Sequence, residues 1–390
     1  MSTVISREIV NLIEAFLIAF PVIGLIGPRQ SGKTTLMKSM FPEYQYFNLE
    51  SPDVRAFIES DPAGFIKSQR HVMIDEVQRM PELLSYIQAA VDERQTMGDF
   101  IVSGSENLLL SGKISQSLAG RAAYATLLPL SIRELALSGE EAGDLDEQIL
   151  RGFYPALYSR EVSPFTYYDQ YVATYVERDL RNISNIRNLS LFRKFLALLA
   201  GRIGQVVNYQ SLSNDVGVSP KMIESWISVL EACYLVIRLQ PYHGNFGKRY
   251  IKSPKVYFTD TGLACYLLGI RDKETLLKHY LIGGLFENLC IMDIRKRILN
   301  FGGHASLYYY RDSNHNEVGL IIDTGITQIP VEMKSSATFT RSFGKGIRYW
   351  KSIVPGALNQ PAYIIYNGDD TLANSNFSLL NWRELNQIVI

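Results

Sequence analysis

The stretch GPRQSGKTT, residues 27–35, constrains the fold of this chain more than any other feature. It follows the apolar run VIGLI and contains the pattern G-x-x-x-x-G-K-[ST] at Gly27, Gly32, Lys33 and Thr34. Glycines at these positions let the backbone curl, so that successive N–H groups point inward at phosphate oxygens. An apolar strand, this loop and a following helix predict a phosphate-binding loop in a nucleotide-binding α/β domain.

Individual side chains of the loop have predicted roles. Lys33 places an ammonium near the outer phosphates, and Thr34 offers a hydroxyl to magnesium. The helix that starts here directs the positive end of its dipole at the phosphates. The residues predicted to contact the nucleotide are Gly27, Pro28, Arg29, Gln30, Ser31, Gly32, Lys33, Thr34 and Thr35.

A second motif lies in HVMIDEVQ, where an apolar strand ends in Asp75 and Glu76. In a hydrolytic nucleotide site, the first acid holds magnesium through water and the second orients and deprotonates the attacking water. A pair of solvated acids at the end of a strand is the alternative. The position of the pair downstream of a phosphate-binding loop favours the magnesium site.

Two further side chains are candidates for contact with the reacting phosphate. The strand DFIVSGS ends in Ser103 and Ser105, and Ser105 is predicted to sense the γ-phosphate. The alternative is that Ser105 caps a helix starting near Glu106. Arg121 is predicted to supply transition-state charge in its own subunit or a neighbour's, with a surface arginine at a helix end as the alternative. Arg29 is a weaker candidate for the same role.

Strands and helices alternate along the first 140 residues. Elements of this length predict a parallel sheet covered by helices on both faces. Ligands of such sheets lie at the carboxyl ends of the strands, where all of the candidate residues above are expected. The expected elements are helix 6–20, strand 22–27, helix 33–41, strand 44–50, helices to about 69, strand 71–77, helix 81–97, strand 99–105, a further helix and strand 122–130.

Composition and charge narrow the class of protein. A chain of 390 residues is long enough for two or three domains, and its formal net charge of zero gives no overall attraction to nucleic acid or acidic membrane. The three cysteines are far apart and match neither a disulfide framework nor a metal cluster, which is typical of a reducing cytoplasm. The apolar N-terminal segment is interrupted by Glu14 and Pro21 and is too short to span a bilayer. A cytoplasmic protein without membrane contact is therefore expected.

The motifs GPRQSGKTT, YFNLESPDVRAF, VMIDEVQRMPEL, IVSGSENLLL and SLAGRAAYATLLPLSIREL resemble the AAA-superfamily ATPases of bacteria and archaea that are fused to a C-terminal domain of unknown function. The resemblance covers nearly the whole chain. It implies a P-loop ATPase domain at residues 1–140 that uses ATP and Mg²⁺. Relatives often form rings, so the resemblance also admits a homo-oligomer in which Arg121 acts between subunits.

The middle of the chain predicts a helical linker at 141–200 and a winged helix at 201–278. A helix, a turn at Gly217 and a second helix capped by Ser219 are followed by two strands. The second helix, 220–233, is mostly apolar, whereas a helix that reads a DNA groove offers Arg, Lys, Asn or Gln. Packing into a core or against a protein partner is one interpretation of this domain. The other is contact with double-stranded DNA through the basic wing residues Lys248, Arg249, Lys252 and Lys255.

In residues 279–390 a helix carries Glu287, and the strand in QIPVEMKSS carries Glu332 and Lys334 two residues apart, hence on one face. This arrangement of a helix acid and a Glu-x-Lys strand resembles the PD-(D/E)XK nuclease superfamily. In that superfamily the acids hold a metal ion and the lysine positions the attacking water. The alternative for Glu332 and Lys334 is a structural pair on the strand.

One position departs from the nuclease pattern, because Gly319 stands where the strand acid is expected. Asp323 has the right side-chain direction but lies about 13 Å further along the strand, and Glu317 lies about 7 Å away. We therefore expect a nuclease-like, restriction-endonuclease-type α/β domain without an intact site, serving as a binding or interaction module.

Together these patterns predict a magnesium-dependent ATPase whose hydrolysis moves a winged helix and a nuclease-like domain. Two alternatives remain open from the sequence. One is an ATP-gated DNA-binding or DNA-cleaving enzyme that acts through Glu287, Glu332 and Lys334. The other is an ATP-dependent switch for a protein partner.

Overall fold

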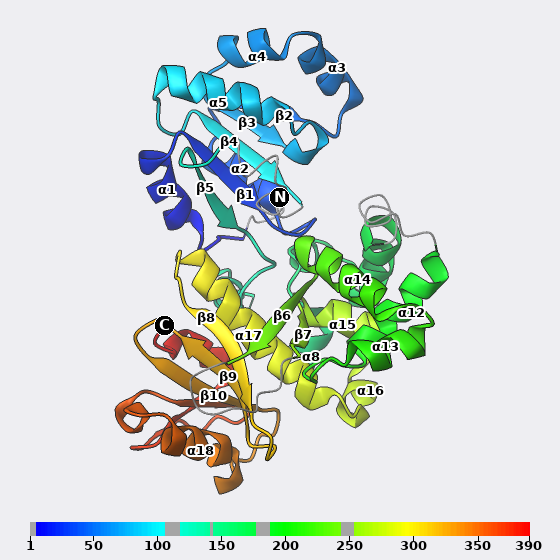
Figure 1. Cartoon of the computed structure of the whole chain (residues 1–390), viewed down its shortest axis with the longest axis vertical. Coiled ribbons are helices and arrows are strands. Elements are labelled where there is room, and N and C mark those ends of the chain that lie inside the picture. The colour runs from blue at the N-terminus through cyan, green and yellow to red at the C-terminus, as the bar shows by residue number, and fades with distance from the viewer. Residues whose placement is uncertain (1–4, 106–117, 141–142, 177–187, 243–252) are drawn as a thin grey trace. The chain divides into compact units, whose positions relative to one another are not determined.

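The computed structural model describes residues 5–105, 118–140, 143–176, 188–242 and 253–390 (Figure 1). The chain forms two compact units. The first comprises the residues up to Leu130 together with Ala232–Tyr234 and Leu299–Gly302. The second comprises Ser131–Glu231, Leu235–Ile298 and Gly303–Ile390.

The first unit is built on a five-stranded sheet in which every strand pairing is parallel, as predicted. Its strands, in spatial order, are β2 (Gln45–Asn48), β3 (Val72–Asp75), β4 (Phe100–Gly104), β1 (Val22–Ile26) and β5 (Ala122–Thr126). Strands β1, β3 and β4 are buried along their whole length. Burial on both faces explains why their sequences are continuous apolar runs and do not alternate with polar residues.

Helices cover both faces of this sheet (Figure 1). They are α1 (Val10–Ala19), α2 (Lys33–Met40), α3 (Pro52–Ser60), α4 (Pro62–Ser68), α5 (Leu83–Arg94) and the short 3-10 helix η1 (Val77–Arg79). The predicted helix after residue 105 lies outside the described residues. Each of the other predicted elements of this unit is present, with ends that differ by a few residues.

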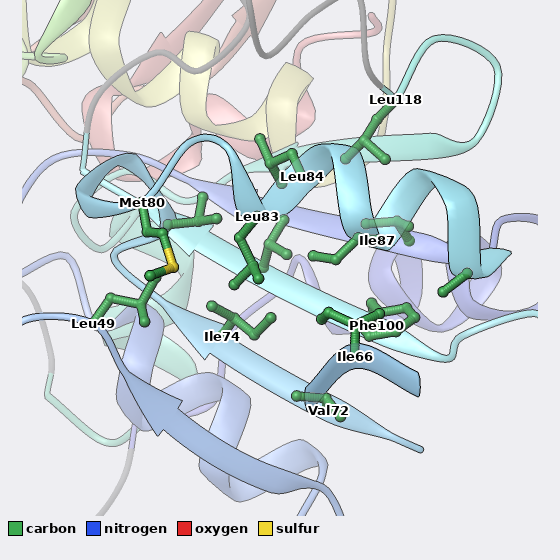
Figure 2. Packing of buried hydrophobic residues seen from close by; sticks show 14 of the residues in the cluster. Leu49, Ile66, Val72, Ile74, Met80, Leu83, Leu84, Ile87, Phe100 and Leu118 are labelled. Atoms are coloured by element: carbon green, nitrogen blue, oxygen red, sulfur yellow. The ribbon is translucent and has the colours of Figure 1, made fainter. Parts of the chain in front are cut away.

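Two apolar clusters lie on the two faces of the sheet. Val22 and Ile26 of β1 belong to the cluster beneath α5, whereas Ile23 and Leu25 belong to the cluster with α1 and α2. This alternation follows from the two-residue period of a strand. Figure 2 shows the first cluster, in which Leu83, Leu84 and Ile87 of α5 pack over β3 and β4 beside Ile74 and Phe100.

The second unit contains an eight-stranded mixed sheet. Strands β8, β9 and β10 pair antiparallel, whereas β11 and β13 run parallel to β10. Helix α18 (Lys345–Ile353) packs against this sheet through Ile347 and Trp350, which are fully buried. The strands, in spatial order, are β12 (Leu372–Ala373), β13 (Ser378–Asn381), β11 (Tyr363–Tyr366), β10 (Gln328–Lys334), β9 (Glu317–Asp323), β8 (Ser306–Arg311), β6 (Val236–Pro241) and β7 (Lys255–Phe258).

The remaining described elements of this unit are helical. The α-helices are α7 (Ile132–Leu137), α8 (Leu145–Arg151), α9 (Ala156–Ser159), α10 (Pro164–Tyr171), α12 (Leu189–Ala200), α13 (Tyr209–Val216), α14 (Pro220–Ala232), α15 (Thr261–Leu267), α16 (Lys273–Lys278) and α17 (Ile282–Asn300). The short elements are the π-helical segment η3 (Val172–Val176) and the 3-10 helices η4 (Arg341–Gly344), η5 (Ala357–Asn359) and η6 (Trp382–Gln387).

The predicted helix-turn-helix is formed by α13 and α14. Gly217 between them has a φ of 92°, and the Ser219 hydroxyl accepts a hydrogen bond from the Met222 N–H at 3.2 Å. The apolar face of α14 is buried, and its Trp226 ring contacts the rings of Phe192 and Phe195 on α12. The buried residues Ile223, Trp226, Ile227 and Leu230 therefore serve packing within the unit, which is one of the two interpretations that the sequence left open, whereas Met222 is exposed.

Strand β6 links the helix-turn-helix to the C-terminal sheet. It pairs antiparallel with β7 and parallel with β8, where Gln240 is opposite Tyr308. The residues predicted to form the linker, the winged helix and the nuclease-like domain fall, where the structure describes them, almost entirely within one compact unit. Among the wing residues, Lys248, Arg249 and Lys252 lie outside the described residues.

The expected DNA contact of Lys255 is wrong. Its side chain is only 2% exposed, and its ammonium forms ion pairs with Glu287 and Glu317 inside the second unit. Lys255 is the first residue of β7, and its pairing places it opposite Leu239 of β6. The basic sequence around Lys255 did not reveal these ion pairs, because Glu287 and Glu317 come from distant parts of the chain.

Two expectations concern the chain as a whole. Cys233, Cys265 and Cys290 are all buried, and none of the three takes part in a disulfide. Within the described ranges, no helix combines the length and apolar character required to cross a bilayer.

Candidate functional site

The phosphate-binding loop joins β1 to α2 at the carboxyl edge of the first sheet. Gly27 and Gly32 have φ angles of 146° and 98°, which favour glycine. A Cβ at Gly27 would lie 2.1 Å from the Leu127 carbonyl oxygen, so this position also requires the absence of a side chain. Both glycines of the motif are therefore required by backbone geometry, in agreement with the prediction from the sequence.

Lys33 begins α2 with its side chain only 5% exposed. Its Nζ donates hydrogen bonds to the carbonyl oxygens of Gly27 and Pro28, each at 2.9 Å. Burial lowers the pKa of Lys33 to about 8, although the nearby carboxylates of Glu76 and Asp75 partly oppose this shift. The ammonium is thus held against the loop by neutral acceptors.

Asp75 lies at the end of β3, where three hydroxyl groups converge on its carboxylate. Thr34 and Tyr46 each donate to Oδ2 at 2.7 Å, and Ser103 donates to Oδ1. The predicted magnesium residues Thr34 and Asp75 are therefore in direct contact. Oxygen ligands of this kind suit Mg²⁺, which is bound by one or two carboxylates together with water and phosphate oxygens, so the residues present fit this ion.

Glu76 follows Asp75 in the left-handed region, with φ 59° and ψ 46°. A residue other than glycine in this region carries a cost of about 1–3 kcal/mol, and such residues cluster at functional sites. Its Oε2 accepts hydrogen bonds from Gln78 Nε2 and, at 3.0 Å, from Ser105 Oγ. The structure thus brings the predicted base and the predicted γ-phosphate sensor together.

Strand order explains why these groups meet. Strand β4 lies between β1 and β3, so its terminal serines are placed between the phosphate-binding loop and the two acids. All three strands are parallel, and therefore their carboxyl ends share one edge.

Arg121 is not at this edge, so its expected position there is wrong. It directly precedes β5, whose first residue Ala122 is opposite Val22 at the start of β1. Five strand residues separate it from the loop end of the sheet, a distance of about 17 Å. Arg121 instead forms a two-pronged ion pair with Asp92 of α5, with N–O distances of 2.5 and 2.8 Å.

Two further loop contacts involve arginines. The buried Arg7 donates to the Ser31 carbonyl at 2.8 Å and to the Leu128 carbonyl at 2.6 Å, which ties the loop to the chain after β5. Arg29 forms an ion pair with Glu50 at 2.9 Å. No role was predicted from the sequence for Arg7 or for Tyr46 on β2. Arg7 lies in no local motif, and Tyr46 opens the stretch YFNLESPDVRAF without a predicted partner, so only the packed sheet reveals what the two side chains contact.

A second cluster of the predicted site residues lies in the second unit. Glu287 of α17, Gly319 of β9, and Glu332 and Lys334 of β10 all line one cavity of about 280 Å³. Lys334 Nζ lies 3.5 Å from Glu332 Oε2. Burial raises the pKa of Glu332 to about 7, opposed by Lys334 and reinforced by Glu287.

This cavity of the second unit does not fit a metal ion as it stands. Glu287 and Glu317 are both engaged by the Lys255 ammonium, and position 319 carries no acid. Within the part of the chain that the structure describes, no group of three or more His, Cys, Asp or Glu side chains is arranged to hold a metal. Asp323, at the far end of β9, is bonded to Gln328 and is not part of the cavity lining.

The parallel sheet, the phosphate-binding loop and the hydroxyl-bound acid of β3 define an AAA-like P-loop ATPase. Residues 19–136 match the family described as "AAA domain". Residues 142–274 and 282–385 match two families described as "Domain of unknown function", DUF8612 and DUF4143.

Several proteins are similar to this chain over most of its length. Uncharacterised proteins of Mycobacterium tuberculosis and Mycobacterium bovis are each 30% identical over 324 residues, covering 82% of this chain and 71% of the relative. One from Haemophilus influenzae is 25% identical over 303 residues, covering 70% of this chain and 73% of the relative. The chain belongs to the family that the mycobacterial proteins represent.

Among solved structures, the Walker-type ATPase of Pyrococcus abyssi is similar to this chain with a TM-score of 0.41 and 16% identity. The match covers 68% of this chain and 96% of that chain.

Proposed function

We propose that the chain is a magnesium-dependent ATPase that uses hydrolysis to control its second unit. The observation that carries the proposal is the contact between Thr34 Oγ1 and Asp75 Oδ2 at 2.7 Å, beside the buried ammonium of Lys33. A hydroxyl from the loop and a carboxylate from β3 meet where the predicted phosphates would enter. This pairing supports a site for a nucleotide together with its metal ion.

The residues of the site divide the chemistry among them. Lys33 binds the outer phosphates, and the Gly27–Gly32 loop presents its N–H groups to them. Thr34 and Asp75 hold Mg²⁺, which when bound neutralises negative charge on the phosphates. Glu76 accepts a proton from the attacking water, and Ser105 contacts the γ-phosphate. The choice of ATP follows from the AAA domain to which residues 19–136 belong.

Arg7 supports a coupling of the site to the rest of the chain. One guanidinium binds the carbonyl of Ser31, inside the loop, and that of Leu128, two residues before the first unit ends. If the loop moves when nucleotide binds, Arg7 would therefore transmit the displacement to the segment around Leu128, which leads into the second unit. Such coupling would let hydrolysis change the state of the helix-turn-helix and the C-terminal sheet.

We further propose that the second unit has a winged-helix and nuclease-like fold that serves binding and not cleavage. The convergence of Glu287, Glu332 and Lys334 on one cavity favours the fold. The glycine at 319 and the ion pairs of Lys255 argue against cleavage. A protein partner or double-stranded DNA is the proposed ligand of this unit, in a cytoplasmic setting.

ATP turnover by the purified chain tests the proposal directly. We expect turnover that requires Mg²⁺ and is lost in Lys33→Ala, which should also bind a fluorescent ATP analogue about a hundredfold more weakly, because it lacks the charge-assisted contacts to phosphate. Equal analogue binding by Lys33→Ala and the unchanged chain would refute the assigned site.

Adding double-stranded DNA over a salt series separates the two partner classes. Stimulation that fades as salt rises would indicate phosphate contacts and a DNA ligand. Turnover indifferent to DNA would favour a protein partner. Plasmid cleavage that needs Mg²⁺ and is abolished by Lys334→Ala would contradict the non-cleaving assignment.

A further inference from the structure

Tyr46 of β2 extends its hydroxyl group to the carboxylate that is predicted to hold magnesium. Its Oη donates a hydrogen bond to Asp75 Oδ2 at 2.7 Å. Thr34 Oγ1 donates to the same oxygen at 2.7 Å, and Ser103 Oγ donates to Oδ1. Hydroxyl groups from β2, α2 and β4 thus hold both oxygens of this carboxylate, which fixes its orientation at the end of β3.

The parallel pairing of β2 with β3 places Tyr46 within reach of Asp75. Tyr46 is opposite Met73, two residues before Asp75, so its side chain has to span about 7 Å along the strands. The ring lies in the apolar cluster with α1 and α2, and Lys38 Nζ is 3.8 Å from the centre of the ring. The ring therefore contributes to packing beneath α2, whereas the hydroxyl group is directed at the acid.

Tyr46 differs from the other two donors in its predicted relation to the ion. Thr34 is predicted to bind the ion itself, and Ser103 also accepts a hydrogen bond from the Glu76 N–H at 3.4 Å. The Tyr46 hydroxyl group contacts the oxygen of Asp75 that Thr34 also contacts. Carboxylates that ligate metals are oriented by hydrogen-bond partners of this kind, whose loss costs about 10–100-fold in metal affinity or activity.

We propose that Tyr46 is a positioning residue for Mg²⁺. Its hydroxyl group holds Asp75 Oδ2 beside Thr34 Oγ1, so that the two ligands are oriented before the ion arrives. Tyr46 acts through Asp75 and does not itself touch the ion. The inference rests on the proposed ATPase function and adds to it a residue that sets the Mg²⁺ concentration at which the site fills.

Binding of a fluorescent, non-hydrolysable ATP analogue over a Mg²⁺ titration tests the proposal without relying on turnover. Tyr46→Phe keeps the ring and removes only the hydroxyl group. We expect this variant to need on the order of tenfold more Mg²⁺ for half-maximal enhancement of analogue binding. Analogue binding in EDTA should equal that of the unchanged chain, because Lys33 and the phosphate-binding loop are intact.

Tyr44→Phe is the matched control. The Tyr44 hydroxyl group donates to the Gly98 carbonyl at 2.6 Å, so this variant also loses one tyrosine hydrogen bond, but one that does not involve Asp75. Its Mg²⁺ requirement should equal that of the unchanged chain. In an Asp75→Asn background, Tyr46→Phe should add little to the Mg²⁺ requirement, since its effect passes through Asp75 and additivity fails for residues in contact.

An unchanged or lower Mg²⁺ requirement in Tyr46→Phe would overturn the proposal, because the hydroxyl group would then be indifferent to the ion or compete with it. An increase shared by Tyr44→Phe, an increase that persists in full with Asp75→Asn, or a loss of analogue binding in EDTA would also overturn it. Each of these results would assign the hydroxyl group to the packing of the first unit. Analogue binding by the unchanged chain that does not respond to Mg²⁺ would instead refute the proposed function together with this inference.

Discussion

Two buried lysines, one in each unit, stand in opposite electrostatic environments. Lys33 is bonded to two neutral carbonyl oxygens, and burial lowers its pKa to about 8. Lys255 is bonded to two carboxylates, and these raise its pKa against the effect of burial. The Lys33 ammonium is therefore hydrogen-bonded to neutral groups, whereas the charge of the Lys255 ammonium is compensated by two carboxylates.

This difference indicates which of the two regions, the surroundings of Lys33 (the first region) or those of Lys255 (the second region), is suited to bind an anionic ligand. A buried cation without direct ion pairs gains stability when an anion arrives, which suits a site for phosphates. A buried cation paired with two acids has no such need. Removing Lys255 takes away the ion pair of Glu287, while Glu317 retains its contact with Arg311 at 3.6 Å. The first region is therefore suited to bind an anion from solution, whereas in the second region the charged side chains compensate one another.

The largest expected effect is on the rate of ATP hydrolysis, and it tests whether the first region is the catalytic site. Glu76→Gln should still bind ATP but hydrolyse it roughly 10² to 10⁴-fold more slowly, because a neutral amide cannot accept the proton of the attacking water. Glu332→Gln is the matched control in the second region and should leave turnover unchanged. Steady-state phosphate release measures both, and unchanged turnover in Glu76→Gln would remove this residue from the mechanism.

Stability provides a second contrast between the two lysines. Lys255→Met should lower the free energy of unfolding by about 3 kcal/mol, since two acids lose their buried partner. Lys33→Ala should change it by no more than about 1 kcal/mol, because only hydrogen bonds to neutral carbonyls are lost. Urea unfolding monitored by tryptophan fluorescence measures the free energy of unfolding of both variants. Equal decreases would contradict the proposed difference between the two lysines.

Glu332 makes the stability of the second region depend on pH. Its folded pKa of about 7 is raised above the ordinary value of 4.5, so below pH 4.5 both the folded and the unfolded states are protonated. Between pH 4.5 and 7 the unfolded state loses this proton first, and stability contributed by the group falls by up to about 3 kcal/mol. Glu332→Gln should therefore gain stability relative to the unchanged chain between pH 5 and pH 8.

Denaturant titrations of Glu332→Gln and of the unchanged chain at pH 5 and pH 8 measure this difference in the free energy of unfolding directly. The comparison cancels the titration of the other acids. A constant difference between the two proteins would show that Glu332 is not a buried acid with a raised pKa.

The smallest effect is expected at Arg121. Because this residue lies at the edge of the sheet opposite the phosphate-binding loop, Arg121→Ala should leave the turnover of an isolated subunit unchanged. If the chain forms a homo-oligomer in which Arg121 reaches a neighbour's nucleotide, turnover should fall by on the order of 10³-fold or more. Phosphate release measured together with sedimentation velocity distinguishes these cases.

Much of the first region was predictable because its chemistry is local. The loop, its lysine and its threonine lie within nine residues, and the two acids are adjacent at the end of a buried strand. Buried parallel strands appear as continuous apolar runs, so the sheet could also be predicted with ends correct to a few residues. The cavity of the second unit was partly predictable, since Glu332 and Lys334 share a strand face.

Sequence alone determined that this chain has a phosphate-binding loop, a paired-acid strand and a parallel sheet to hold them. Only the tertiary structure determined the partners of Arg7, Tyr46 and Lys255. It also showed that Arg121 lies at the amino ends of the strands, away from the phosphate-binding loop. Arg7 and Leu128 are 121 positions apart, and Lys255 and Glu317 are 62 apart. No local pattern encodes such pairs, because strand order and burial, which act through the whole fold, determine which side chains meet.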